Sequence, residues 1–360
     1  MWRKIGRVLG VILGWGAILA YILFASHLAQ EHRAEQRVGN IIVTMADSTA
    51  TEQFATSDRI IKQLKRGGFN IENEPVDSLD AVTISEYIAR NGFVRDVDVY
   101  VTYSGDTHID IKQHEPVVRL LCGGVNSYVT PDGVIFRSPQ GAAYYAAVVT
   151  GAYKPMFASD YEGSANAHYA TLVDRENEKL AHLGKEFQAL KNRRGECLSQ
   201  RSELRKQGKK GFFESNESYK LRKVGVDAEI TKCTEQLSQL SKRKLQLEKR
   251  QRSVELHKKK LKKKYDDFTN LINFVTQVSD DSFWRSEIVQ FVADTTSTGE
   301  ISLRLVPRSG DFVIEYGTLA NGKEKMRKLQ TFYENGLSRI GWNRYKIVDI
   351  RYSKQVICTE

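Results

Sequence analysis

Residues 94–114 read VRDVDVYVTYSGDTHIDIKQH, and the first folded unit can be predicted outward from them. From Val94 to Tyr103 apolar and polar residues alternate with a period of two, as they do in a strand with one buried face. Ser104-Gly105-Asp106 then provide a tight turn, and the alternation resumes as far as His114. We therefore expect two adjacent strands joined by a short turn.

The residues before this pair predict a strand and two helices. Residues 40–45, NIIVTM, are apolar and β-branched, which is typical of a strand. Thr56 or Ser57 can cap a first helix, and apolar residues within 82–88 mark a second, shorter one. The order β-α-α-β-β predicts a compact α+β domain over residues 37–115, with a sheet edge available for pairing.

The N-terminal segment has the composition of a membrane anchor. Residues 8–25 contain no charged side chain, and with their apolar neighbours they reach the roughly 20 residues that span a bilayer core. Arg3, Lys4 and Arg7 precede the run, which places the N-terminus in the cytoplasm and the bulk of the chain outside. The alternative is a cleaved signal peptide, whose apolar core is usually about 7–15 residues. We expect residues 1–36 to be a cytoplasmic stub and a transmembrane anchor.

A second, β-rich domain is predicted in two parts, residues 116–156 and residues 266–360. In the first part, Pro131-Asp132-Gly133 between two apolar runs is a hairpin turn signal. In the second part, residues 323–335 predict a helix with one apolar face. The strands expected there are residues 287–293, 300–306, 311–316 and 345–352.

Residues 157–265 separate the two parts and predict a long antiparallel helical hairpin. Mostly apolar residues recur at spacings of three and four from Leu180 to Leu204 and again from Val226 to Val275, as in coiled-coil seams. Polar residues also occupy the seam, among them Arg194, Arg201, Lys244 and Lys258, and they weaken the hairpin or fix its register. A short link that contains glycine separates the two arms. The first arm would be roughly 60 Å long. The second arm runs in register into residues 268–275, so we expect the hairpin to grow from a helix of the β domain.

The hairpin carries all the excess positive charge. From Ala165 to Lys264 there are 27 Lys or Arg and 13 Asp or Glu, a net charge of +14, while the rest has a net charge of −4. The basic runs 242–244 and 258–264 could bind lipid headgroups or acidic cell-wall polymers, or form a solvated helical face. Because the excess is confined to this segment, we expect no nucleic-acid partner. The hairpin's own partner is not predicted.

Chemical motifs point away from catalysis. There is no nucleophile elbow, phosphate-binding loop, zinc-protease motif or dinucleotide loop, so we expect no catalytic residue and no cofactor. None of the four cysteines has metal-like spacing, and no metal site is expected. If the hairpin turn is centred on residue 215, Cys197 faces Cys233, and a disulfide between them is a hypothesis.

Several stretches, in order, resemble the FtsQ/DivIB family of bacterial cell-division proteins. The β-α-α-β-β unit resembles a POTRA domain, and residues 115–120, EPVVRL, resemble the exit from it. The C-terminal part resembles the β domain of FtsQ from the Bacteroidota lineage, from which the hairpin departs as an insertion. The residues that carry this part of the resemblance are 281–284 (DSFW), 303–311 (LRLVPRSGD), 332–333 (FY), 341–345 (GWNRY) and 355–358 (QVIC).

The resemblance implies a non-enzymatic scaffold in the inner membrane at the division septum. It would recruit FtsB and FtsL, and through them the septal peptidoglycan synthase, by adding a partner strand to the edge formed by the last strand. Arg351 would pair with a partner acid and Tyr352 would be a buried aromatic anchor. The implied partner-binding residues are Ile347, Val348, Asp349, Ile350, Arg351 and Tyr352.

Two other functions remain open at this point. The POTRA-like unit is compatible with an envelope-assembly factor that binds unfolded outer-membrane strands. The basic hairpin is compatible with a coiled-coil membrane tether, in which the hairpin itself makes the essential contact.

Overall fold

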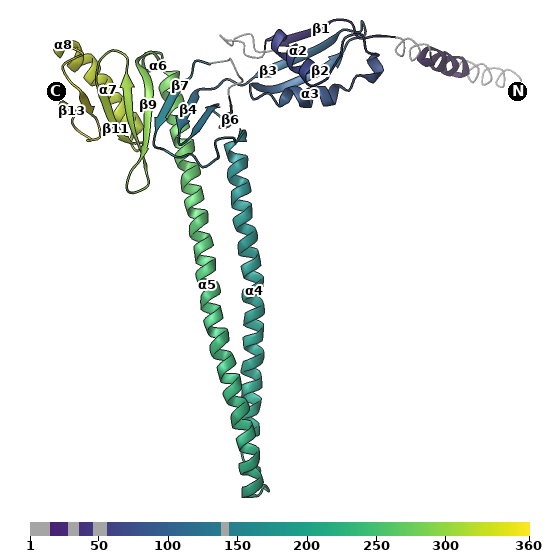
Figure 1. Cartoon of the computed structure of the whole chain (residues 1–360), viewed down its shortest axis with the longest axis vertical. Helices are drawn as coiled ribbons and strands as arrows, with labels where there is room; N and C mark the ends of the chain where they lie inside the picture. Colours follow the sequence, from purple (N-terminus) through teal and green to yellow (C-terminus); the bar gives the residue numbers. More distant parts are fainter. Residues whose placement is uncertain (1–14, 28–35, 46–55, 138–143) are drawn as a thin grey trace, which may run out of the picture.

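The computed structural model describes residues 15–27, 36–45, 56–137 and 144–360 (Figure 1). Residues 15–27 are helical. Within the described ranges, no helix combines the length and the apolar character needed to cross a membrane. The predicted anchor, residues 8–25, begins outside the described residues, so the transmembrane segment stays a prediction.

The first unit is a three-stranded sheet with two helices on one face. The strand β3 lies in the centre, parallel to β1 and antiparallel to β2. Ile109 and Ile111 of β3 are fully buried against Ile60 and Ile88 of the helices, so the alternation in the sequence marks the core face. The predicted β-α-α-β-β order is confirmed. The elements are β1 (Ile41–Met45), α2 (Ser57–Arg66), a 3-10 turn (Val76–Ser78), α3 (Ala81–Ala89), β2 (Val94–Val101) and β3 (Thr107–Gln113).

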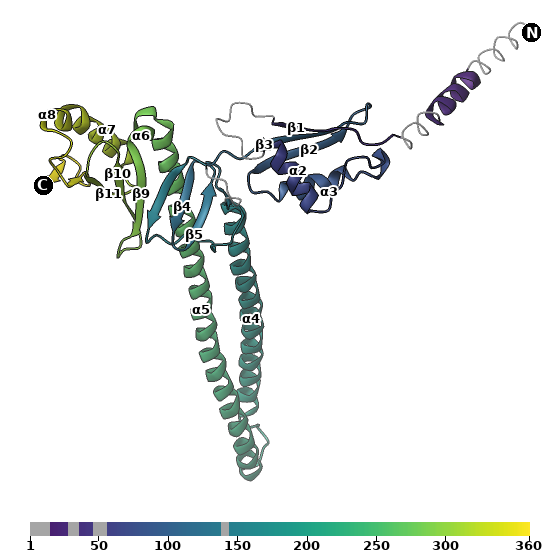
Figure 2. The same ribbon diagram turned by 45° about the horizontal axis from the view of Figure 1, so that its top comes forward.

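The second unit is built on a ten-stranded sheet to which both sides of the insertion contribute (Figure 2). Its order is β13-β12-β11-β10-β9-β7-β4-β5-β6-β8, and β9 pairs in parallel with β7 across the break in the sequence. The strands are β4 (Val118–Cys122), β5 (Val125–Val129), β6 (Val134–Phe136), β7 (Ala147–Gly151), β8 (Gly163–Ser164), β9 (Ile288–Thr295), β10 (Ile301–Pro307), β11 (Val313–Thr318), β12 (Ile347–Asp349) and β13 (Ile357–Thr359).

Helices α5 (Asn216–Asp280), α6 (Ser282–Glu287) and α7 (Gly322–Phe332) supply the other half of this core. Phe268 and Val275, near the C-terminal end of α5, are buried with the sheet. After α7 the chain forms a π-helical turn (Tyr333–Leu337) and a short α8 (Ser338–Ile340). The expectation that the hairpin grows from a helix of the β domain is confirmed.

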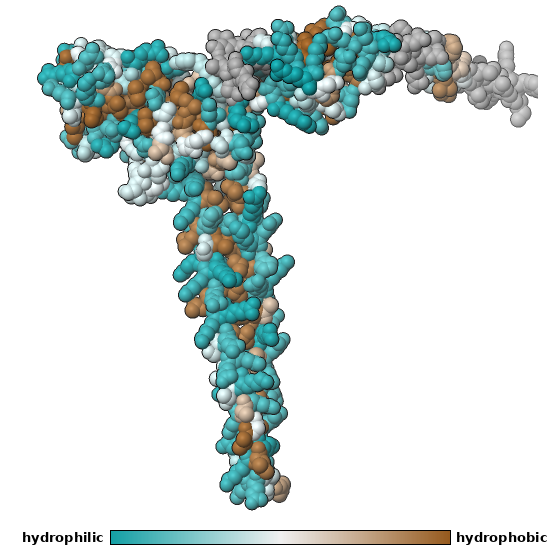
Figure 3. All heavy atoms as spheres, viewed as in Figure 1, coloured by the Kyte–Doolittle hydropathy of each residue, from teal (hydrophilic) through white to brown (hydrophobic). Residues whose placement is uncertain are grey.

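The hairpin consists of α4 (Ala165–Gln207) and the N-terminal part of α5, and it projects from the sheet (Figure 1). At 1.5 Å per residue, the 43 residues of α4 correspond to about 65 Å. The two helices pack along a seam of apolar side chains, visible as brown atoms along the shaft in Figure 3. The buried apolar residues of the seam are Leu190, Leu204, Val226, Cys233, Leu237 and Leu247.

The disulfide hypothesis is wrong, because Cys197 and Cys233 are both free thiols. The link between the helices spans residues 208–215, but at this height the two arms are aligned about a point between residues 216 and 217, past the assumed residue 215. Cys197 Sγ instead lies 3.8 Å from Oε1 of Gln236, which follows Cys233 by three residues along α5.

An aromatic cluster joins the POTRA-like unit to the β domain. Phe93, just before β2, is buried together with Tyr128 and Phe136 of β5 and β6. The ring centroids of Phe93 and Phe136 are 5.1 Å apart, and His114 stacks on Phe136 at 5.6 Å. These contacts fix one unit against the other.

Candidate partner-binding edge

In the structure, the predicted partner strand does not lie at the edge of the sheet. β12 covers only Ile347–Asp349 and lies between β11, to which it is parallel, and β13, to which it is antiparallel. The expectation that the strand ending at Tyr352 forms the edge is therefore wrong. The chain turns back after Tyr352, and residues 357–359 add one further strand outside it.

The six predicted binding residues have different surroundings. Val348 and Ile350 are fully buried in the core, and Asp349 is only 8% exposed. Ile347 and Tyr352 are 40% and 48% exposed, and Arg351 is also at the surface. Only Ile347, Arg351 and Tyr352 have side chains that a partner can reach, so the other three can act only through the backbone they position.

Arg351, just after β12, forms an ion pair with Asp349, the last residue of that strand. Its Nη2 lies 2.6 Å from Asp349 Oδ2, and its Nε donates to Oδ1 at 3.0 Å. The hydrogen bond from Arg351 lowers the pKa of the Asp349 carboxyl, and the pKa of Arg351 is raised in turn. The Arg351 side chain also covers Gly317, where an added Cβ would approach its Cγ to 2.8 Å. A partner carboxylate would have to compete with Asp349 for this guanidinium.

Lys328 of α7 holds the backbone that follows β12. Its ammonium group donates to the carbonyl of Ile350 at 2.8 Å and also to the carbonyl of Tyr352. Burial lowers the pKa of Lys328. The lysine thereby positions Tyr352 at the surface. Reasoning from the sequence missed this residue, because nothing in the helical pattern of α7 shows which backbone carbonyls it meets.

The hydrogen bonds of β12 show which groups of β13 face outward. Val313 donates its N–H to the carbonyl of Lys346, and Ile350 donates to the carbonyl of Glu315. Val348, between these two bonds, therefore faces β11, while Ile347 and Asp349 face β13, where their partners are Thr359 and Ile357. The N–H of Lys346, just before β12, also donates to the carbonyl of Thr359 at 2.8 Å. The amide and carbonyl of Cys358, between Ile357 and Thr359, consequently point away from β12.

Apolar side chains accompany this edge on the outer face of the sheet. Ile347 and Ile357 are each 40% exposed. They share one face, because Ile347 pairs with Thr359 and Ile357 with Asp349, on neighbouring strands. A strand added beside β13 would meet outward backbone groups at Cys358 and the apolar side chain of Ile357 together.

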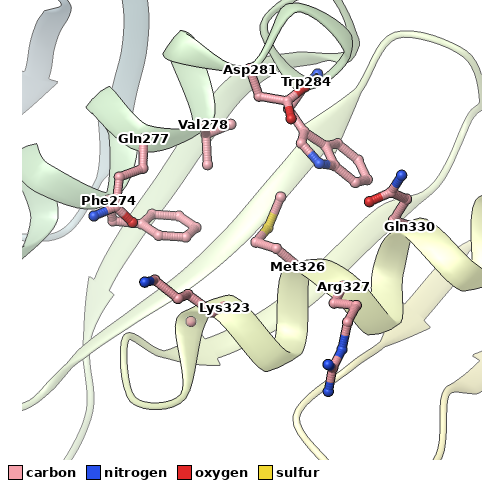
Figure 4. Close-up of a pocket in the computed structure, with 10 residues that line it drawn as sticks. Phe274, Gln277, Val278, Asp281, Trp284, Lys323, Met326, Arg327 and Gln330 are labelled. Carbon is pink, nitrogen blue, oxygen red and sulfur yellow. Dashed lines mark hydrogen bonds between the residues drawn. The ribbon is translucent and has the colours of Figure 1, made fainter.

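A pocket of about 290 Å³ lies on the opposite, helical side of the sheet, between α5, α6 and α7 (Figure 4). Trp284, Met326 and Phe274 give it apolar walls, and Lys323 lies at its rim. Asp281 in its lining already accepts hydrogen bonds from the N–H groups of Phe283 and Trp284 as the cap of α6. Its carboxylate therefore caps the N-terminus of α6.

The two histidines of the POTRA-like unit's last strand and its exit, His108 and His114, both stack on aromatic rings. His108 stacks on Tyr100 at 5.2 Å, and His114 stacks on Phe136. In the described part of the chain, no group of three or more His, Cys, Asp or Glu side chains is placed to hold a metal ion.

Comparison with known families gives two matches, in the order of the two folded units. Residues 38–112 match the POTRA-like domain family, and residues 241–359 match the family described as FtsQ/DivIB, C-terminal related. None of the curated proteins matches the chain. A POTRA-like domain followed by this type of β domain defines a protein of the cell-division scaffold class. The chain belongs to the FtsQ/DivIB family, whose members are non-enzymatic scaffolds.

Proposed function

We propose that this protein is a membrane-attached division scaffold that captures FtsB and FtsL by strand addition at its C-terminal sheet edge. Through that pair it would recruit the septal peptidoglycan synthase. Residues 1–36 would anchor the chain in the inner membrane at the septum, with the N-terminus in the cytoplasm. The periplasmic bulk would comprise the POTRA-like domain (37–115) and the β domain (116–156 and 266–360), interrupted by the hairpin (157–265).

The outward amide and carbonyl of Cys358 on β13 are the observation that carries this proposal. Sheet edges with available backbone groups accept an extended partner segment, whose main chain supplies affinity and whose side chains supply specificity. Here Ile357, Ile347 and Tyr352 would provide the apolar contacts, and the Arg351 guanidinium a charged one. Val348, Asp349 and Ile350 would contribute by holding β13 in register.

Replacing Cys358 by proline distinguishes partner binding through the backbone of β13 from binding through side chains alone. Cys358→Pro removes the outward N–H but leaves the hydrogen bonds of Ile357 and Thr359 to β12, and proline is tolerated on an edge strand with this orientation. Cys358→Ala is the matched control, because it removes the same thiol and keeps the N–H. One lost hydrogen bond at about 0.5–1.5 kcal/mol, together with the ring facing the incoming strand, predicts about a tenfold loss of affinity.

The measurement is the affinity of each variant for the FtsB-type protein of the same organism, alone and with its FtsL. Cys358→Ala should bind as the wild type does and Cys358→Pro should bind at least about tenfold more weakly, with equal urea midpoints for both variants. Equal affinity of the two variants would remove β13 as the docking strand. Depletion in the host should give filamentous cells with unfinished septa, and cells of normal length would contradict the division role itself.

A further inference from the structure

The free end of the hairpin presents two aromatic side chains to solvent. The link between α4 and α5, residues 208–215, reads GKKGFFES. Phe212 and Phe213 are each 96% exposed, and their ring centroids lie 5.0 Å apart. Leu221 and Val224, in the first turns of α5, are exposed as well. Figure 3 shows pale brown atoms among hydrophilic ones at this end of the shaft.

The link is braced, so the phenyl rings are held outward by a defined loop. Arg222 Nη2 lies 2.6 Å from Glu214 Oε2 and donates to the carbonyl of Lys209 at 3.2 Å. Glu214 also accepts the N–H of Gly211 at 3.0 Å. The hydrogen bond from Arg222 lowers the pKa of Glu214 to about 2, so the pair stays charged at neutral pH.

Positive charge surrounds the apolar residues. Residues 205–224, which we call the tip, contain seven Lys or Arg and two Glu. One of those glutamates, Glu214, forms an ion pair with Arg222. Lys209, Lys220 and Lys223 are exposed beside the loop. The tip thus combines protruding apolar groups with long, mobile cations.

We propose that the tip binds the surface of an anionic phospholipid bilayer, with Phe212 and Phe213 entering the acyl-chain boundary and the lysines at the phosphates. Apolar side chains that project from a cationic segment are the features of an interfacial membrane site. The tip is a convex end, which fits a deformable lipid surface. Four exposed apolar side chains, two of them aliphatic, need an apolar medium that a nucleic acid or an acidic polysaccharide does not offer. The length of α4 carries this end about 65 Å from the sheet.

Vesicle flotation of the full-length protein kept soluble in amphipol tests the proposal. The vesicles contain phosphatidylcholine, with or without phosphatidylglycerol. The test variant is Phe212→Ser/Phe213→Ser. The matched control is Leu198→Ser/Leu245→Ser, which removes two exposed apolar side chains from the shaft. Every variant keeps residues 1–36, so attachment through the N-terminal segment is the same in each.

The wild type and the shaft control should float with the anionic vesicles, more weakly as salt is added, and the tip variant should bind at least about tenfold more weakly. Benzoylphenylalanine in place of Phe213 should crosslink to lipid in cells. Equal flotation of the tip variant, or no preference for anionic vesicles, would overturn the proposal. A crosslink to a protein in place of lipid would overturn it as well.

Discussion

Replacing Phe136 by alanine should loosen the joint between the POTRA-like unit and the β domain. Phe136 is 1% exposed and lies 5.1 Å from Phe93 and 5.9 Å from Tyr128, measured between ring centroids. Burial of its side chain contributes about 1.5–3 kcal/mol, and two aromatic pairs add about 0.5–1.5 kcal/mol each. The expected cost is therefore about 3–5 kcal/mol of unfolding free energy, as for other buried phenylalanines.

Urea unfolding followed by tryptophan fluorescence measures this cost, because Trp284 and Trp342 both belong to the β domain. Phe212→Ala is the matched control, since it truncates the same residue type at a site 96% exposed, and it should change the unfolding free energy by less than about 0.5 kcal/mol. Limited proteolysis should in addition cut the Phe136→Ala variant between the two units. A cost below about 1 kcal/mol would refute the role of this cluster as the joint.

Two further predictions concern buried polar groups. Tyr333→Phe removes the hydrogen bond of 3.1 Å to the buried Glu287 carboxylate and should cost about 1–3 kcal/mol in urea unfolding; an unchanged midpoint would contradict it. Burial lowers the pKa of His114 below its usual 6.5, an effect that Arg95 reinforces and Asp132 opposes. The unfolded chain therefore takes up the proton first, and stability should fall as the pH drops below about 6.5. His114→Gln should flatten this pH dependence, which urea midpoints at about pH 7.5 and about pH 5 can compare.

The hairpin and the POTRA-like unit could be predicted from the sequence because their patterns are long. Spacings of three and four persist from Leu180 to Leu204 and from Val226 into the β-domain core, and only a helix keeps such residues on one face. The register was harder to predict. It depends on where the eight-residue link bends, and that placed Cys197 against Gln236 instead of Cys233.

The sheet edge shows where side-chain patterns stop being informative. Val348 and Ile350 alternate with exposed or polar neighbours whether or not another strand lies beside them, because alternation reports the faces of a sheet and not its neighbours. The three residues of β13 are too few for a periodic signal. For this reason the candidate residues were predicted to form the edge, although β12 lies one strand inside it, and the contacts of Lys328 were missed.

The position of the hairpin also bears on how the chain reaches this fold. Thr150 and Gln290, which hydrogen bond across β7 and β9, are 140 residues apart in the chain. Joining two strands over such a distance carries a large loop-closure entropy. Helices form in about a microsecond from local contacts, and a zipped hairpin brings the start of α4 beside Tyr265 of α5, on whose ring Tyr169 stacks at 4.5 Å. Once the hairpin has formed, the pairing of β7 with β9 is nearly local. The sheet can therefore close at the rate of a much smaller protein.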